Sequence, residues 1–131
     1  MENDSYRVAE VIHTMIRRVK IRVFLKGSSS DYGRMIAFAW FDAYELRNTI
    51  GMLDIDELDM KTVHFSAEAL YEHNPGDEMK GSFIGYEYRH ILEIELKNDE
   101  AQIAAVTQAL SACKLKPDFR IDYITTDKEE R

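Results

Sequence analysis

The sequence predicts an α+β domain in which an antiparallel sheet of four to five strands carries two main helices on one face. Two long segments between Leu58 and Leu96 alternate apolar and polar residues, and Val19 to Gly27 does the same. Tyr32 to Leu53 instead carries apolar residues at helical spacing. A period of two is typical of a half-buried strand and a period near 3.6 is typical of a helix. The fold class follows from these three segments.

The stretch from Leu58 to Leu96 predicts a long β-hairpin at the centre of the sheet. The turn-forming residues His73-Asn74-Pro75-Gly76-Asp77 separate its two arms. Each arm places one set of residues on one side: Val63, Phe65, Ala67, Ala69 and Tyr71 in the first, and Ile84, Tyr86, Tyr88, Leu92, Ile94 and Leu96 in the second.

The strand predicted from Val19 to Gly27 has one apolar and one basic face. Val19, Ile21, Val23 and Leu25 share the apolar side. The basic residues of this region are Arg17, Arg18, Lys20, Arg22 and Lys26. They indicate a solvated strand face, because no glycine-rich loop or aromatic platform accompanies them.

The long helix predicted from Tyr32 to Leu53 follows the residues Ser28 to Asp31, which can cap its N-terminus. Its apolar arc is broad, since Phe38, Phe41 and Tyr44 add to the stripe that faces the sheet. An uncovered aromatic patch would indicate a partner surface. The N-terminal segment or a loop could equally cover it, and the sequence leaves both open.

A second helix is predicted after Asn98, its expected N-cap, and a last strand from Phe119 to Ile124. The apolar stripe of this helix ends at Cys113, for which a buried structural thiol is expected. The segment Ser5 to Val19 is ambiguous: its spacing favours a helix, while its β-branched residues also suit a strand. Residues 1–4 and 125–131 are expected to be flexible.

Composition limits the class of protein. The 131 residues fit one domain spanning 1–131, and the net charge of −7 opposes binding to nucleic acid or anionic membranes. The longest apolar run, Met35 to Phe41, is too short to cross a bilayer. The acidic N-terminus does not resemble a signal peptide, so a soluble cytoplasmic protein is expected, or an exported one if a leader has been removed.

No catalytic, metal or cofactor motif emerges. The histidines His13, His64, His73 and His90 lack a metal-binding spacing, and a single cysteine forms neither an internal disulfide nor a multi-cysteine zinc site. If the hairpin parity holds, His64 and His90 lie on opposite sides of the sheet. The sequence also lacks a nucleophile elbow and phosphate-binding loops. We therefore predict no catalytic residue, no metal and no cofactor.

Residues 46–124 resemble the SIMPL domain family of mostly exported bacterial proteins. Asp59-Met60-Lys61-Thr62 resembles the motif that opens a strand in that family, and Tyr71 lies where that strand ends. The segment from Gly85 to Ile94 resembles its Gly-Tyr strand, and a helix and a strand follow. The resemblance implies no catalytic residues, and it implies oligomers, because some bacterial members form rings. The family's first and last elements have no counterpart here, and the resemblance would make the N-terminal segment a strand.

Two functions are compatible with these observations. The first is a non-enzymatic interaction or assembly domain, with a homo-oligomer or another protein as partner. The alternative is a ligand-binding domain or an enzyme with a pocket between the long helix and the sheet, near Trp40, Tyr44, Tyr86 and His90. A third, weaker hypothesis is binding of acidic partners through the basic strand.

Overall fold

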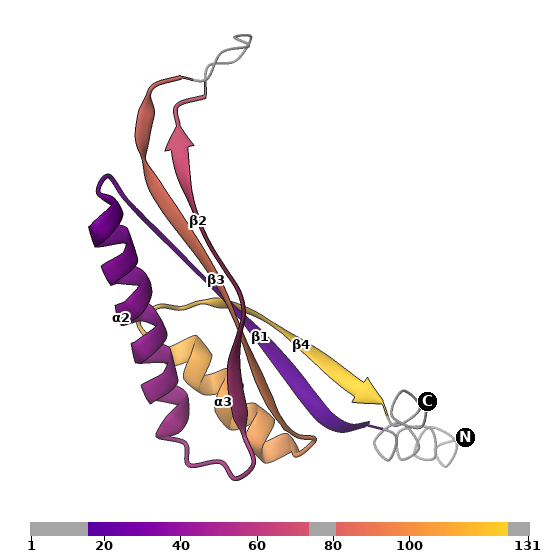
Figure 1. The fold of residues 1–131 in the computed structure, drawn as a ribbon. Helices are drawn as coiled ribbons and strands as arrows, with labels where there is room; N and C mark the ends of the chain where they lie inside the picture. The colour runs from indigo at the N-terminus through magenta and orange to yellow at the C-terminus, as the bar shows by residue number, and fades with distance from the viewer. Residues whose placement is uncertain (1–15, 74–80, 126–131) are drawn as a thin grey trace, which may run out of the picture.

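The computed structural model describes residues 16–73 and 81–125. Within these ranges the chain forms four strands and two helices (Figure 1). Their bounds in chain order are β1 Ile16–Ser29, α2 Tyr32–Gly51, β2 Asp59–Tyr71, β3 Phe83–Lys97, α3 Glu100–Ala112 and β4 Asp118–Thr125.

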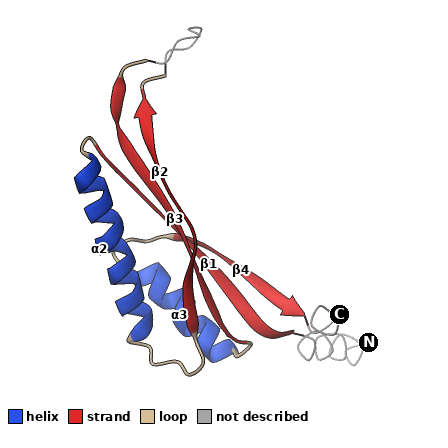
Figure 2. Ribbon diagram, in the orientation of Figure 1, coloured by secondary structure: helices blue, strands red, loops and turns tan. Residues whose placement is uncertain are grey.

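The four strands form one antiparallel sheet in the order β2-β3-β1-β4. Strand β3 lies between β1 and β2, and β1 lies between β3 and β4. The chain therefore makes two split βαβ units. Both helices cover the same face of the sheet (Figure 2). This confirms the predicted α+β class. The hairpin is central only through β3, because β2 forms one edge of the sheet.

The core lies between the sheet and the helices. Alternate residues of β1 and β3 turn toward the helices and are buried, as the period of two predicts. The fully or nearly fully buried apolar residues are Val19, Ile21, Val23 and Leu25 of β1, Tyr88, Leu92, Ile94 and Leu96 of β3, Met35, Ala39, Leu46 and Ile50 of α2, and Val106 and Leu110 of α3.

Tyr88 connects the middle of the sheet to α2. Its ring is fully buried, and its hydroxyl donates a hydrogen bond to the Asp42 carboxylate. Burial, together with the hydrogen bond and negative charge of Asp42, raises the pKa of Tyr88 above its ordinary value. The ring lies against Gly27 on β1, where an added Cβ would be 2.8 Å from Tyr88 Cε1. The small residue therefore makes room for the tyrosine.

The helix termini differ slightly from the prediction. Asp31 caps α2 by accepting a hydrogen bond from the backbone N–H of Arg34. Asp99, not Asn98, caps α3, because its carboxylate accepts from the N–H groups of two following residues. Cys113 caps the C-terminus of α3 and is half-buried rather than buried.

The predicted hairpin between β2 and β3 is confirmed, with two irregularities. The register shifts between Thr62 and His64, which leaves Val63 as an extra residue in β2. It shifts again between Leu70 and Tyr71, where Ile84 is the extra residue in β3. Gly85, next to this second bulge, has a φ of +152°, a conformation that suits glycine. The predicted turn lies largely outside the described residues.

The face of the sheet without helices carries charged residues. Glu93 is buried there, its side chain only 4% exposed, with Lys20 Nζ at 3.7 Å, Arg22 Nε at 3.8 Å and Lys61 Nζ at 3.5 Å. Arg18 donates to Glu95 at 2.8 Å. The basic side of β1 is therefore matched by carboxylates of β3.

The ambiguous N-terminal segment is resolved at its end only. Ile16 to Val19 belong to β1, against the helical interpretation, and residues 5–15 lie outside the described ranges. Residues 1–4 and 126–131, for which flexibility is predicted, also lie outside the described ranges. Thr125 is paired with Ile16 in the sheet and does not belong to a flexible tail. None of the described helices has the length and apolar character needed to span a membrane.

Candidate functional site

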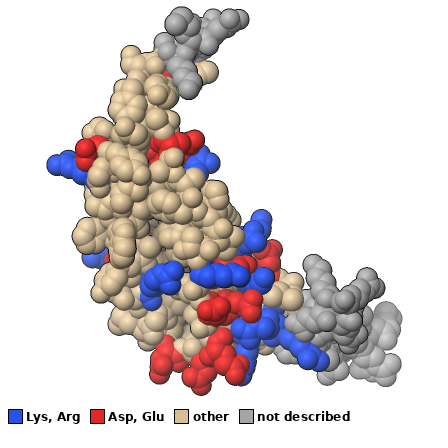
Figure 3. Space-filling model, in the orientation of Figure 1, with Lys and Arg blue, Asp and Glu red and all other residues tan. Residues whose placement is uncertain are grey.

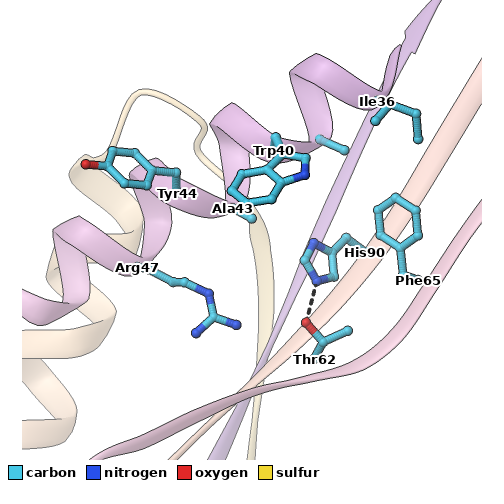
Figure 4. A pocket seen from close by; sticks show the side chains of 9 residues that line it. Ile36, Trp40, Ala43, Tyr44, Arg47, Thr62, Phe65 and His90 are labelled. Atoms are coloured by element: carbon cyan, nitrogen blue, oxygen red, sulfur yellow. Dashed lines mark hydrogen bonds between the residues drawn. The ribbon is translucent and has the colours of Figure 1, made fainter. Parts of the chain in front are cut away.

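A groove of about 400 Å³ separates α2 from β2 (Figure 4). One side of α2 lines it with Ile36, Ala39, Trp40, Ala43, Tyr44 and Arg47. These positions are three or four residues apart and so share one face of the helix. The opposite wall consists of Thr62 and Phe65 from β2 and His90 from β3. The groove thus lies where the alternative hypothesis predicted a pocket.

His90 is the buried polar residue of this groove, with an exposure of 7%. Its Nε2 lies 2.9 Å from Thr62 Oγ1, and the Phe65 ring packs edge-on at a centroid distance of 5.3 Å. Nδ1 has no hydrogen-bond partner among the described residues. Burial lowers the pKa of His90 below its ordinary 6.5, and the positive charge of Arg47 lowers it further. His90 is therefore neutral near pH 7.

The structure brings together three of the four predicted site residues. Trp40, Tyr44 and His90 line the groove, but Tyr86 does not. Tyr86 lies nearer the start of β3, where its ring packs edge-on against Phe83 and against Tyr32, the first residue of α2. Tyr86 does not reach the groove because it lies beside the start of α2, and the hairpin extends past that end of the helix (Figure 1). Tyr86 and His90 are four residues apart on β3, so they share a face of the sheet without sharing neighbours on α2.

Sequence reasoning missed Arg47, Thr62 and Phe65. Arg47 follows Trp40 and Tyr44 on the same helical face, so the spacing alone could have identified it. Thr62 could not have been placed, because strict alternation puts it on the side opposite Phe65. The bulge at Val63 brings both to the helix-covered side.

Beside the groove the molecule exposes aromatic side chains. Trp40 is 74% exposed, Tyr44 61% and Phe65 44%. Phe38 and Phe41 of the same helix are also exposed. Most of the surface over the hairpin and α2 is uncharged, while charged side chains gather toward the end where β1 begins (Figure 3). Within the described residues, the aromatic arc of α2 is thus largely uncovered.

The edge of the sheet at β2 borders this surface. In the described part of the chain, β2 pairs with β3 alone over a strand of 13 residues. From His64 to Tyr71 the strand contains one carboxylate, Glu68, and no proline. Such an edge can pair with a further strand.

Two other predicted features do not form a site. His64 pairs with Ile91 while Phe65 pairs with His90, so the two histidines lie on opposite faces of the sheet, as the parity predicted. Across residues 16–73 and 81–125, no cluster of three or more His, Cys, Asp or Glu residues could hold a metal ion. Lys20 and Arg22, central to the hypothesis of acidic partners, already face Glu93.

Comparisons with known proteins give weak structural likenesses. No protein-family model and no curated protein matches the sequence. The solved structures that resemble the fold include the GlnK–ATP complex of B. subtilis, with 13% identity, a TM-score of 0.41 and coverage of 82% of this chain and 84% of that one. They also include a hydantoinase/carbamoylase family amidase from Burkholderia multivorans, with 13% identity, a TM-score of 0.40 and coverage of 82% and 27%. AtUAH in complex with glyoxylate gives 14% identity, a TM-score of 0.42 and coverage of 84% and 28%. The chain therefore spans little more than a quarter of the two larger proteins, and likenesses of this size carry no function over.

Proposed function

We propose that this chain is a non-enzymatic interaction domain that self-associates through the edge of β2 and the adjacent aromatic surface of α2. The observation that carries the proposal is the exposed edge strand itself, which borders Trp40, Tyr44 and Phe65. An open edge offers backbone hydrogen bonds, and an adjacent apolar surface adds burial.

A second copy of this chain is the partner that the surface fits best. In a symmetric dimer the same patch must meet itself, and two β2 strands related by a twofold axis pair antiparallel. The sheet then continues across the dimer, and both α2 helices lie on the same face, flanking a shared apolar trough over the two β2 strands. The low charge of residues 64–71 keeps like charges from meeting along most of this seam.

The resemblance of residues 46–124 to the SIMPL domain family agrees with self-association. No family model supports this resemblance, so it stays a prediction. A partner of different sequence could use the same edge, and the experiment below distinguishes the two cases.

Sedimentation velocity over a series of protein concentrations tests the proposal. We expect a dimer for the natural chain and a monomer for Ala67→Lys/Ala69→Lys, since lysines on an edge strand oppose pairing. Both alanines are exposed, so the variant should keep the circular dichroism spectrum of the fold.

Ala101→Lys/Ala104→Lys is the matched control, because it adds the same charge at exposed positions of α3. This control should remain dimeric. A natural chain that stays monomeric at all concentrations contradicts self-association. A dimer that persists in Ala67→Lys/Ala69→Lys contradicts the use of β2.

A further inference from the structure

The groove between α2 and β2 contains a polar atom that the described protein residues leave unsatisfied. His90 is only 7% exposed, and its Nδ1 lacks a hydrogen-bond partner among the described residues. In Figure 4 the ring nitrogen bonded to Thr62 faces β2, and the other ring nitrogen points toward α2, on the side of Trp40 and Ala43. Buried polar atoms are satisfied in the great majority of cases, so an orphaned one aimed into a groove indicates a missing partner.

The rest of the groove defines the shape and charge of that partner. Trp40 and Phe65 present aromatic rings on opposite walls, which suits a flat apolar body. Arg47 places a guanidinium group at the groove (Figure 4), and no carboxylate of the described residues forms an ion pair with it. An arginine in this position favours a carboxylate, which it can bind with two hydrogen bonds.

We propose that this groove binds a small aromatic carboxylate that carries a hydroxyl group at the end opposite the carboxylate. The ring lies between Trp40 and Phe65, the carboxylate pairs with Arg47, and the hydroxyl bonds Nδ1 of His90. A hydroxyl suits this nitrogen in either tautomer of a neutral imidazole, because it can both donate and accept. The volume of about 400 Å³ falls within the range of small-molecule sites.

This site goes beyond self-association: it shares Trp40 and Phe65 with the surface that borders the proposed seam, but ligand binding needs no second copy. All the residues invoked belong to one copy of the chain. The binding experiment is therefore run on the natural chain and on the exposed-edge variant Ala67→Lys/Ala69→Lys, so that each proposal can fail without the other.

The single tryptophan, Trp40, reports directly on the groove, because it is the sole indole of the chain and forms one wall. Titration with 4-hydroxyphenylacetate should change its fluorescence with a saturable profile. Phenylacetate, which lacks the hydroxyl, should bind roughly three- to tenfold more weakly, the effect of one neutral hydrogen bond. A neutral analogue, 4-hydroxyphenethyl alcohol, should lose about tenfold or more.

Two arginine variants of α2 provide the protein-side test. Arg47→Gln should weaken binding of 4-hydroxyphenylacetate by about tenfold and leave that of the neutral alcohol unchanged. Arg34→Gln removes the same charge from an exposed position near the start of the helix and should leave both affinities unchanged. Both positions are exposed, so folding should survive either change.

Nitrogen chemical shifts of the histidine rings test the contact with His90 without altering a buried residue. Binding of 4-hydroxyphenylacetate should shift Nδ1 of His90, and phenylacetate should shift it much less. An absence of saturable binding, equal affinities for the acid and its neutral analogue, or an unmoved Nδ1 signal each overturns the proposal.

Discussion

Gly27 shows how a single residue sets the position of a core side chain. A methyl group at this position would lie 2.8 Å from Tyr88 Cε1, closer than real contacts allow. The Tyr88 ring cannot easily retreat, because it is fully buried and its hydroxyl bonds Asp42.

We therefore expect Gly27→Ala to lower the free energy of unfolding by about 1–2 kcal/mol, the cost of overpacking less the gain of removing a strand glycine. Gly51→Ala is the control, since nothing lies within 4 Å of an added Cβ at that helical position. It should be neutral or stabilising by up to about 1 kcal/mol. Urea denaturation of both variants checks the pair, and equal losses would contradict the role assigned to Tyr88.

His90 should make stability depend on pH. Its pKa in the folded chain lies below the ordinary 6.5, because burial and the facing Arg47 disfavour the charged ring, while Thr62 bonds it without adding charge. The unfolded chain binds the proton more readily. The stabilising contribution is therefore complete above pH 6.5 and is lost as the pH falls through 6.5 toward the lower, folded pKa.

Denaturation between pH 7.5 and 5 tests this dependence of stability on pH, because the range spans the ordinary histidine pKa of about 6.5. The measurement compares the natural chain with His90→Leu. The natural chain should lose more stability than the variant as the pH falls. His64→Gln, on the opposite face of the sheet, should retain the slope, since His90 is still present. Parallel pH profiles for the natural chain and His90→Leu would contradict the prediction.

At the level of single residues, the sequence predicted those whose position follows from helical spacing. Trp40 and Tyr44 are four apart, and the groove-facing side of α2 follows from that spacing. Tyr86 shares a face of β3 with His90, but which part of that face lies opposite the groove-lining side of α2 depends on tertiary packing. Asn98 and Asp99 are both good caps, and only the geometry of the chain selects Asp99.

Among the elements, β2 illustrates what alternation can and cannot predict. The residues Phe65, Ala67 and Ala69 do share one face of the sheet. Their cross-strand partners on β3 are His90, Tyr88 and Tyr86. The extra residue Val63 reverses the alternation before them, and a bulge of this kind leaves no mark in the sequence of β-branched and polar residues around it. All four strands and both helices of the described ranges were nevertheless predicted, because each carries several periods of its pattern.

The open face of the sheet depends on Glu93, which holds charges from three strands together. Lys20 and Arg22 of β1 and Lys61 of β2 surround its nearly buried carboxylate on β3. Glu93→Gln removes the negative charge and leaves three cations close to one another. We expect a loss of about 1–2 kcal/mol in the free energy of unfolding, limited because the cations keep part of their hydration.

Asp122→Asn is the matched control for Glu93→Gln. It breaks the exposed pair with Arg120, joined at 3.2 Å, and should change the free energy of unfolding by less than about 0.5 kcal/mol. Guanidinium chloride would screen the charges, so thermal unfolding at low ionic strength is the suitable measurement. A loss for Glu93→Gln no larger than that of the control would contradict the role of the cluster.

For the whole molecule, the uneven distribution of charge agrees with self-association. The net charge is −7, yet on the face shown in Figure 3 most of the surface over the hairpin and α2 is uncharged, and most of the charged side chains gather toward the end where β1 begins. Copies of the chain repel one another in most orientations and approach more easily through the uncharged side. The edge position of β2 follows from the order of the strands, and the exposure of Trp40 follows from the way α2 packs on the sheet, so neither could be read from the sequence.

Association of this kind makes thermal stability depend on concentration. The midpoint of unfolding of the natural chain should rise as the protein concentration increases, because a dimer gains from mass action. The midpoint of Ala67→Lys/Ala69→Lys should not change. Differential scanning calorimetry at several concentrations measures both, and an invariant midpoint for the natural chain would contradict a dimer that dissociates on unfolding.

The pairing of Ile16 with Thr125 also has a mechanical consequence. The described chain enters the sheet at the start of β1 and leaves it at the end of β4, and these two points are neighbours on adjacent antiparallel strands. A force that pulls them apart acts across the strands and opens the β1–β4 hydrogen bonds one after another. A pull on these two points should therefore unzip the domain at low force. A pull along the axis of the β2–β3 hairpin would instead load many inter-strand hydrogen bonds in shear at once.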